Sequence, residues 1–326
     1  MAVLTKINTK DISYIENQFN FGKIKLFAGI KKGIENTNYL IKTKNKKFIL
    51  TIFEERVHGG YKKKDLNFFM KLMSKLSKSK INCPEPFKNK KGNYLFKIKN
   101  KNACIVKFLK GKDKEQLSSK DCFSVGKNIA KLHRASNKIK LFRKNSLSVG
   151  SWSKLLSKID YRINKVSRNL KYRMKNDIKE IKKKWPKNLP KGIIHCDLFI
   201  DNIFFYKKKF YGFIDFYFSS TDFLAYELAT SINALCFNKK KNKFILDKKK
   251  SSKLIKGYES IRKLKKSEKK HFSIMCRGSA LRYLLTRAYD YLNTPKNAVI
   301  KKKNPREYLD KLNFHKQINR FSEYLG

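Results

Sequence analysis

Over the first third of the chain, apolar and polar residues alternate in short runs separated by polar turns, which is the pattern of half-buried strands. Between the third and fourth of these runs, the apolar residues change to helical spacing over residues 64–77. The predicted strands are residues 22–30, 38–43, 47–53, 94–98 and 103–109. This part of the chain therefore predicts a small antiparallel sheet with one helix.

From Ser118 onward the spacing of apolar residues is mostly helical. A helix over 121–133 is predicted with Ser118 or Ser119 as its cap, and the very basic stretch 155–184 is predicted as one long helix. Short strands near 193–194, 203–206 and 211–214 are expected to follow, and then helices to the end.

Together these elements predict an α+β fold of two lobes. We expect residues 1–108 to form an N-terminal lobe built on the antiparallel sheet, and residues 109–326 to form a mainly helical C-terminal lobe. Small molecules commonly bind between two such lobes, so a ligand site is expected there.

The net charge adds a question about partners. The 326 residues carry a formal net charge of +54, which taken alone suggests a nucleic acid or an anionic membrane. The lysines, however, are spread between apolar stretches, in runs such as 207–209 and 248–250, rather than gathered in one basic arm. We interpret the charge as a lysine-rich solvated surface without a specific nucleic-acid partner, and a basic nucleic-acid-binding protein is the more remote alternative.

Cysteine spacing and the apolar content bear on the compartment. Six scattered cysteines without a close C-x-x-C pair argue against a metal cluster and favour free thiols in a reducing environment. The first residues, MAVLTKINTKDISY, lack the apolar core of a signal peptide, and no segment approaches the roughly 18 apolar residues of a membrane span. We expect a cytoplasmic protein with no membrane partner.

Residues 194–216, IHCDLFIDNIFFYKKKFYGFIDF, are the most informative segment for chemistry. Asp197 follows one predicted strand, Asn202 opens the next, and Asp215 ends the strand after that. A hairpin over the KKK turn would bring Asn202 and Asp215 together, where an amide oxygen and a carboxylate suit a hard ion such as Mg²⁺. Asp197 would then face a hydroxyl group, as phosphoryl transfer to an alcohol requires. His195 is expected to order this loop.

The combination of HCDLFIDN and FIDF resembles the aminoglycoside phosphotransferase and choline kinase group, whose catalytic lobe is similar to that of protein kinases. More narrowly, GIENTNYLI, FILTIFEE, GFIDFYFSSTDFLAYELA and RGSALRYLLTRAYDY, with their spacing, resemble the bacterial homoserine kinases of this fold over nearly the whole chain. The resemblance implies a protein-kinase-like fold and ATP-dependent phosphorylation of the side-chain hydroxyl of L-homoserine, a step of threonine biosynthesis. It implies Asp197 as catalytic base, with Asn202 and Asp215 as Mg²⁺ ligands. The alternative acceptor is another small hydroxylated metabolite: choline, an aminoglycoside, a fructosamine or methylthioribose.

Nucleotide-binding residues are marked less clearly. Thr51 stands in the third predicted strand where the wider kinase pattern has a lysine or arginine for the phosphates, which agrees with the homoserine kinases but leaves that cation unidentified. The turn with Gly33, Asn36 and Thr37 would cover the phosphates, although it lacks G-x-G-x-x-G and an ordinary hairpin turn is the equal alternative. A kinase fold that has lost catalysis is a further alternative, which the missing lysine favours and the intact acids oppose.

A substrate with a carboxylate and an ammonium group needs partners of both signs. Arginine suits the carboxylate because its planar fork donates two hydrogen bonds, and Arg282 and Arg287 are the candidates, with surface ion pairs as the alternative. Asp201 and Asp222 are candidates for the ammonium, although Asp222 could equally cap the following helix. Tyr217 is predicted either to line the substrate site or to lie in the core. Further members of these sets are Arg277 and Glu227.

Overall fold

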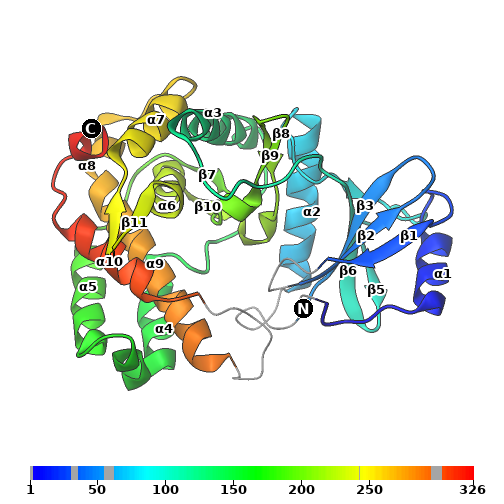
Figure 1. The fold of residues 1–326 in the computed structure, drawn as a ribbon, viewed down its shortest axis with the longest axis horizontal. Coiled ribbons are helices and arrows are strands. Elements are labelled where there is room, and N and C mark those ends of the chain that lie inside the picture. Colours follow the sequence, from blue (N-terminus) through cyan, green and yellow to red (C-terminus); the bar gives the residue numbers. More distant parts are fainter. Residues whose placement is uncertain (1–2, 31–35, 55–61, 242, 295–302) are drawn as a thin grey trace. The chain divides into compact units, whose positions relative to one another are not determined.

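The computed structural model describes residues 3–30, 36–54, 62–241, 243–294 and 303–326. The chain divides into two compact units, which we describe one at a time (Figure 1). The first unit consists of Met1–Lys110 with Gly212–Tyr217, and the second consists of Gly111–Tyr211 with Phe218–Gly326. The first unit thus includes a short segment from much later in the chain.

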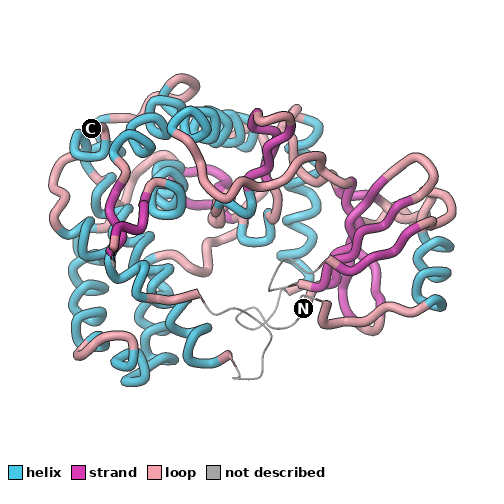
Figure 2. Tube along the Cα trace, viewed as in Figure 1, coloured by secondary structure: helices cyan, strands magenta, loops and turns pink. Residues whose placement is uncertain are grey.

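An antiparallel sheet forms the first unit, as predicted. Its strands lie in the order β1-β2-β3-β6-β4, and β5 pairs with β6 (Figure 2). The elements are α1 (Thr9–Gln18), β1 (Leu26–Gly29), β2 (Thr37–Lys42), β3 (Lys47–Ile52), α2 (Lys63–Lys78), β4 (Pro86–Phe87), β5 (Leu95–Ile98) and β6 (Lys101–Lys107). The predicted helix over 64–77 is confirmed as α2.

The helix α1 was not predicted from the sequence. It begins at a capping box, in which the Asn8 side chain accepts from the Asp11 amide at 3.0 Å and the Asp11 carboxylate accepts from the Asn8 amide at 2.9 Å. Its only buried residue is Ile15, so the helix lacks the repeated apolar face that periodicity detects.

Phenylalanine dominates the core of the first unit. The side chains of Phe19, Phe21 and Phe48 pack together with ring centroids 5.2–5.6 Å apart. Ile41 and Leu50, from β2 and β3, are fully buried in the same cluster. These contacts join the sheet to the segment that follows α1.

The second unit is mainly helical, as predicted, and its strands pair two by two. The helices are α3 (Ser119–Ser136), α4 (Trp152–Ile159), α5 (Leu170–Lys184), α6 (Leu224–Leu235), α7 (Lys248–Glu259), α8 (Lys266–Lys270), α9 (Phe272–Asn293) and α10 (Arg306–Lys316). The strands are β7 (Lys191–Ile194), β8 (Ile203–Tyr206), β9 (Lys209–Phe213), β10 (Ser220–Phe223), β11 (Phe237–Lys240) and β12 (Lys243–Leu246), and the last two residues of β9 belong to the first unit. β7 pairs with β10, β8 with β9, and β11 with β12. The hairpin expected over the KKK turn is therefore present.

The prediction of one long helix over 155–184 is wrong. α4 ends at Ile159, and α5 begins only at Leu170. Between them, Asp160 and Asn169 both have a positive φ, of 52° and 53°, and Asn169 lies in the left-handed region. Aspartate and asparagine adopt this conformation more readily than most residues, and a single such residue ends a helix. The Ser118 cap of α3 is confirmed, since its hydroxyl accepts from the Asp121 amide at 3.1 Å.

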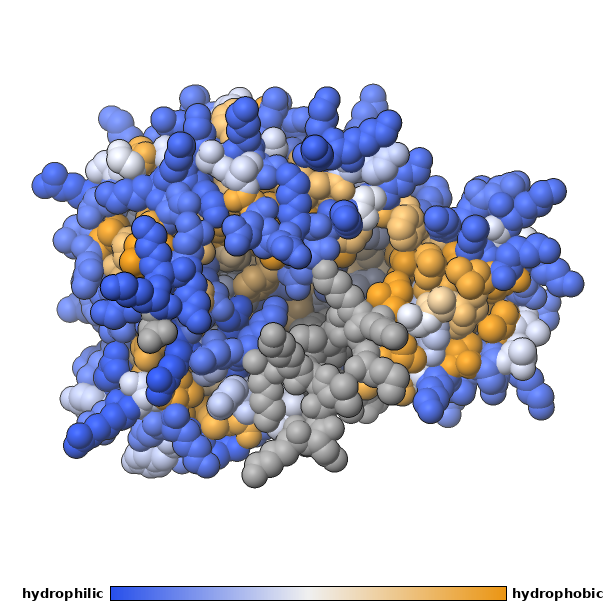
Figure 3. Space-filling view, viewed as in Figure 1, coloured by the Kyte–Doolittle hydropathy of each residue, from blue (hydrophilic) through white to orange (hydrophobic). Residues whose placement is uncertain are grey.

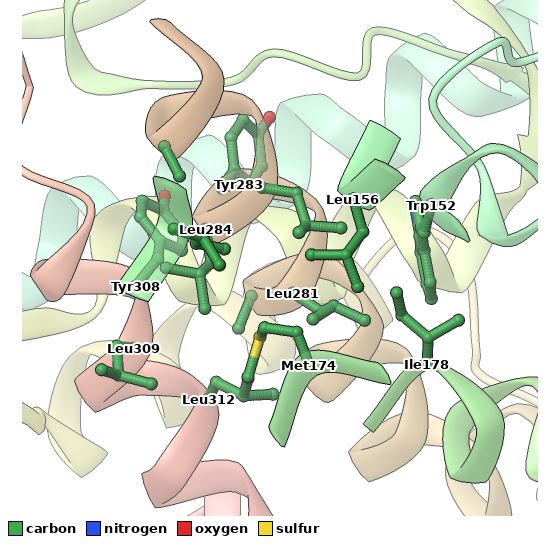
Figure 4. Close-up of a cluster of buried hydrophobic side chains, with 14 of the residues drawn as sticks. Trp152, Leu156, Met174, Ile178, Leu281, Tyr283, Leu284, Tyr308, Leu309 and Leu312 are labelled. Atoms are coloured by element: carbon green, nitrogen blue, oxygen red, sulfur yellow. The ribbon is translucent and has the colours of Figure 1, made fainter. Parts of the chain in front are cut away.

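Helix α9 runs through the core of the second unit. Figure 4 shows Leu281 and Leu284 of α9 packed among residues of neighbouring helices, and both are fully buried. The surrounding side chains include Trp152 and Leu156 of α4, Met174 and Ile178 of α5, and Leu309 and Leu312 of α10. A helix held on this many sides is a rigid support for whatever its other residues contact.

Most of the visible surface of the second unit is hydrophilic, whereas the first unit shows a hydrophobic area with hydrophilic residues around it (Figure 3). The six cysteines are all buried and none is in a disulfide. None of the helices in the described residues is both long and apolar enough to span a membrane.

Candidate active site

The loop between β7 and β8 carries the candidate catalytic residues. After β7 the chain turns through Cys196, whose φ is 67°, and Asp197 follows. A short 3-10 turn, Ile200–Asn202, then leads into β8. The Asn202 amide nitrogen donates to the Asp197 carbonyl at 2.8 Å and to its carboxylate at 3.1 Å. The turn thus brings Asp197 and Asn202 into direct contact.

Glu227, on α6, holds the backbone of this loop. Its carboxylate is fully buried and accepts hydrogen bonds from the backbone N–H groups of His195 and Cys196, the latter at 3.2 Å. Burial raises the pKa of Glu227 to about 7, although these two donors and the charge of Arg282 act in the opposite direction. Glu227 was among the acids considered for a substrate ammonium group, and the structure directs its carboxylate to the loop backbone instead.

Two consecutive side chains of α9 hold the same loop through a carbonyl group. The Nη1 atom of Arg282 and the hydroxyl of Tyr283 each donate to the Cys196 carbonyl oxygen at 2.9 Å. The Tyr283 hydroxyl also lies 3.4 Å from the Asp197 carboxylate. Arg282 is only 2% exposed. Sequence analysis did not single out Tyr283, and the only available signal was its place next to Arg282.

The groups around Asp197 shift its pKa in opposite directions. Burial raises its pKa above the ordinary value, and the nearby Asp201 carboxylate adds to this. The charges of Arg282 and Lys303 and the hydrogen bond from Tyr283 act in the opposite direction. The side chain itself is partly exposed, so a carboxylate with a raised proton affinity is accessible on this loop.

Two other predicted residues lie on the same loop. His195 is fully buried, and its backbone N–H donates to Glu227, so the residue is part of the ordered loop. Asp201 lies in the 3-10 turn and is partly exposed. Asp201 lies close enough to Asp197 for its negative charge to raise the pKa of the candidate base.

Asp222 lies in β10, not at the start of a helix. One carboxylate oxygen accepts from the Asn145 amide at 2.8 Å, and the other accepts from the Phe223 backbone N–H at 2.8 Å. The N-cap of α6 is Phe223, so the capping role considered for Asp222 is not found. Both oxygens of Asp222 already have partners within the second unit.

Arg287 contacts the aromatic ring of Phe199, which lies on the same loop. Its guanidinium carbon lies 4.4 Å from the Tyr308 ring centroid and 5.8 Å from that of Phe199. Its Nη1 atom pairs with Glu307 at 2.5 Å. The ammonium of Lys303, which sequence analysis did not consider, lies 5.1 Å from the same Phe199 ring. Two cations therefore flank Phe199, two residues after Asp197.

Arg277, the third arginine of α9 considered for the substrate, lies at a different place. Its guanidinium donates to both carboxylate oxygens of Glu180 on α5, at 3.0 and 2.7 Å. This bidentate pair is a helix-to-helix contact.

Asp215 belongs to the first unit. It follows β9 and adopts a left-handed conformation with φ of 64°. The strand end just before it contacts the backbone of Asn82, where the Phe213 N–H donates to the Asn82 carbonyl at 3.1 Å. Gly212 permits this approach, since a Cβ there would lie 2.4 Å from the same oxygen. Asn202 lies in the second unit, so its expected closeness to Asp215 stays a prediction.

Tyr217 lies in the core of the first unit, which was the alternative to lining a substrate site. It is 8% exposed, and its ring packs edge-on against Phe53 and Phe69, at 5.0 and 5.8 Å. Its hydroxyl lies 3.7 Å from the Cys104 sulfur. Burial raises its pKa.

Among the residues predicted to contact a nucleotide, Asn36 directly precedes β2, Thr37 begins β2 and Thr51 lies in β3, whereas Gly33 falls outside the described residues. The Thr51 hydroxyl donates to the Asn38 amide oxygen at 2.7 Å. The Asn36 amide oxygen accepts from the Glu54 backbone N–H at 3.2 Å, and the Thr37 hydroxyl donates to the Glu54 carboxylate at 2.6 Å. Asn36 and Thr37 therefore take part in a buried polar network.

Glu54 is the centre of that network. It is 4% exposed and accepts from Thr5 at 2.7 Å and from the Lys101 ammonium at 2.5 Å. Burial alone would raise its pKa, but the hydrogen bonds from Lys101, Thr37 and Thr5 hold the pKa below the ordinary value. Lys101, the first residue of β6, is thus a cation that already has an anionic partner.

Known proteins resemble this chain at two levels. A family model described as the phosphotransferase enzyme family matches residues 27–262. A homoserine kinase of Allorhizobium ampelinum is 40% identical over 324 residues, which cover 99% of each chain. A homoserine kinase of Agrobacterium fabrum is 39% identical, with 99% of this chain and 98% of that protein covered.

Solved structures show the fold. A structure titled amicoumacin kinase hAmiN in complex with AMP-PNP, Ca²⁺ and Ami is similar over 95% of each chain, with a TM-score of 0.71 and 12% identity. The choline kinase of Cryptosporidium parvum is similar over 96% of this chain and 93% of that one, with a TM-score of 0.64 and 16% identity. The two-unit α+β fold is thus the protein-kinase-like fold of these kinases, as the sequence resemblance implied.

Proposed function

This chain belongs to the phosphotransferase enzyme family and, within it, to the homoserine kinases, and on that premise we propose that it transfers the γ-phosphoryl group of ATP to the side-chain hydroxyl of L-homoserine. The product is O-phospho-L-homoserine, in a step of threonine biosynthesis. The observation that carries this proposal is the similarity to homoserine kinases over 99% of the chain. A reaction between ATP and a free amino acid belongs in the cytoplasm, where we propose that this protein acts.

Asp197 is the proposed catalytic base. Phosphoryl transfer needs a group that aligns the acceptor hydroxyl and takes its proton as the bond to phosphorus forms. A partly exposed carboxylate whose pKa is raised by desolvation supports this role, and so do the two donors, Asn202 and Tyr283, which fix its orientation. His195 contributes to the same loop through its backbone.

Asn202 and Asp215 are the proposed ligands of Mg²⁺. The amide nitrogen of Asn202 contacts Asp197, which leaves the amide oxygen as the atom for a metal. An amide oxygen and a carboxylate are hard donors, and Mg²⁺ commonly takes one or two protein oxygens with phosphates and water as its other ligands. When bound, the ion would neutralise charge on the ATP phosphates during transfer.

Removing the Asp215 carboxylate tests the metal assignment. Asp215→Ala should abolish the Mg²⁺-dependent part of nucleotide binding, because Asn202 alone offers a single neutral oxygen. Titration calorimetry of ATP with and without Mg²⁺ measures this directly. An unchanged magnesium dependence would show that the metal is held elsewhere.

The substrate's charged groups find proposed partners near Asp197. Asp201, partly exposed beside the base, is the acid we propose for the ammonium, whereas the oxygens of Asp222 are already used. Arg287, whose guanidinium lies over the Phe199 ring, is the arginine we propose for the carboxylate. Residues 33, 36, 37 and 51 remain the proposed nucleotide side of the site.

An assay of ADP release with MgATP decides the reaction and the substrate together. The acceptors are homoserine, choline, kanamycin and none. We expect turnover with homoserine alone. Turnover with another alcohol would retain the phosphotransferase activity and replace the substrate. Silence with every acceptor, together with salt-sensitive RNA binding, would favour the nucleic-acid alternative.

A further inference from the structure

The peptide groups on both sides of Cys196 are unusually well fixed. Cys196 is not a glycine, yet its φ is 67°, a conformation that persists in a non-glycine residue only where the surroundings enforce it. Its N–H donates to Glu227, and its carbonyl accepts from both Arg282 and Tyr283. The residue that follows is Asp197, so these contacts fix the backbone from which the candidate base projects.

The carbonyl contacts come from α9, a helix whose residues are buried along most of its length. Arg282 and Tyr283 are consecutive residues of α9, and the guanidinium carbon of Arg282 lies 4.4 Å from the Tyr283 ring centroid. Figure 4 shows Tyr283 within the buried cluster that also contains Leu281 and Leu284. A shift of the loop would therefore have to break two hydrogen bonds to a helix that does not move easily.

We propose that Arg282 and Tyr283 are positioning residues for phosphoryl transfer, which hold the Cys196 carbonyl and thereby fix the direction in which the Asp197 carboxylate points. This inference rests on the proposed function, since it assigns Asp197 the role of base. Neither residue needs to touch the substrate. A displacement of a catalytic group by about 1 Å can reduce a rate by about 100-fold, so a backbone contact of this kind affects kcat strongly.

The surroundings of Arg282 argue against the role that its residue type suggested. An arginine that binds a substrate carboxylate presents two N–H groups to an accessible site. Arg282 is 2% exposed, and one of its terminal nitrogens already donates to a backbone carbonyl. Its charge instead lies near two protein carboxylates, Asp197 and Glu227, and opposes the rise in pKa that burial causes in each.

Kinetics with two acceptors separates positioning from substrate binding. The second acceptor is 3-aminopropan-1-ol, which is homoserine without its carboxylate. If Arg282 positions the loop, Arg282→Gln lowers kcat by about 10- to 100-fold with both acceptors, and the ratio of their kcat/KM values stays as in the wild type. The KM for MgATP stays within about twofold, because uniform binding is not affected.

Matched variants control for loss of fold. Arg277 lies on the same helix and is 8% exposed, but its guanidinium pairs with Glu180 on α5. Arg277→Gln should therefore keep kcat even where it lowers the unfolding temperature as much as Arg282→Gln does. Arg282→Lys retains a donor and should restore part of the lost kcat. Tyr283→Phe keeps the ring in the core, and so it tests the proposal even if Arg282→Gln does not fold.

The two α9 residues should also show coupled effects. Both donate to one oxygen atom, so the losses of kcat from Arg282→Lys and Tyr283→Phe should not multiply in the double variant. Two independent structural defects would multiply.

Several outcomes would overturn the inference. A raised KM for homoserine with kcat retained, and a loss of preference over 3-aminopropan-1-ol, would make Arg282 a substrate ligand. Wild-type kcat in both Arg282→Gln and Tyr283→Phe would remove any positioning role. If the wild type turns over a different acceptor, the proposed substrate fails, and the kcat comparison on that acceptor still decides the role of Arg282.

Discussion

Asp197 is the proposed catalytic base, and its contacts with Asn202 and Tyr283 are seen in the structure. Replacement by asparagine retains the shape of the side chain but removes its ability to accept a proton. We expect Asp197→Asn to lower kcat by about 10²- to 10⁴-fold, the usual contribution of a general base, and to leave MgATP affinity nearly unchanged. Stopped-flow ADP release and nucleotide titration give the two values. Asp160→Asn, at an exposed aspartate, is the control, and an Asp197→Asn rate within a few-fold of wild type would exclude the base role.

Glu227 should make stability depend on pH. Its pKa rises from 4.5 to about 7 on folding, so between these values the folded state holds a proton that the unfolded state has released. The stabilising contribution is complete below pH 4.5 and is lost as the pH rises through 7. A shift of this size corresponds to about 3 kcal/mol.

Glu227→Gln removes this titration, because glutamine does not ionise. The difference in unfolding free energy between wild type and Glu227→Gln should therefore change by about 3 kcal/mol in favour of the variant between pH 4.5 and 8. Urea unfolding at several pH values measures it, with the exposed Glu115→Gln as control. A difference that stays constant with pH would mean that folding does not change the pKa of Glu227.

Among single residues, the sequence revealed those functional residues that lie close together along the chain. Asp197 and Asn202 were found because their spacing is short and their types are specific, and their contact is now visible. The sequence indicated Glu227 and Arg282 only as charges, and Tyr283 not at all. These three meet the loop from 31 to 87 residues away, a relation that only the packing of α6 and α9 creates.

Among the elements, β2 illustrates how one hydroxyl joins two parts of a unit. The Thr37 hydroxyl accepts from the backbone N–H groups of Leu4 and Thr5, at 2.9 and 3.1 Å, and donates to Glu54. The Thr37 hydroxyl therefore attaches the segment before α1 to the sheet, together with Tyr39 and Glu54, which bond to Thr5 and Ile7. Periodicity does not predict such a contact, because the segment 3–7 has no regular structure of its own.

Thr37→Val keeps the shape of the side chain and removes these hydrogen bonds. We expect it to lower the unfolding free energy by about 1–3 kcal/mol, because buried donors and an acceptor lose their partner. Hydrogen exchange of the Leu4 and Thr5 amides should accelerate selectively. Thr43→Val, which removes a hydroxyl that bonds to Lys46 in the adjoining turn, should leave those two amides protected. Equal protection in both variants would contradict the assignment.

Element prediction succeeded where pattern and local chemistry agreed. The β2–β3 pair, α2 and the Ser118 cap each have a repeating apolar face or a specific end signal. It failed over 155–184, where two residues with positive φ, Asp160 and Asn169, interrupt a sequence that otherwise favours a helix. Strands such as β10 and β11 are only four residues long, too short for a period of two to stand out.

For the whole molecule, the net charge of +54 should make stability depend on salt. Like charges repel in the compact state, and dissolved ions screen this repulsion over about 30 Å at 0.01 M but about 10 Å at 0.1 M. We expect the unfolding temperature to rise by several degrees between these concentrations, as calorimetry would record. An unfolding temperature that falls with salt would show that attractive ion pairs outweigh the repulsion.

The fold class follows from the sequence more completely than the site does. Alternating runs followed by helical spacing were sufficient for the α+β prediction, and the resemblance narrowed it to the protein-kinase-like fold. The closeness of Asn202 and Asp215 depends on how the two units meet, and no local pattern determines that relation. The cationic side chain that contacts the ATP phosphates is not identified, for the same reason.

Because every cysteine is buried and unpaired with another, the chain carries internal reporters of its own opening. Cys83 and Cys104 lie in the first unit, and Cys122, Cys196, Cys236 and Cys276 in the second. A thiol-specific reagent can modify a buried sulfur only in molecules where that region has transiently unfolded. Mass spectrometry of partly labelled protein would therefore give a separate opening rate for each unit, without any added probe. The same experiment with nucleotide present would reveal in which unit the ligand lowers the opening rate.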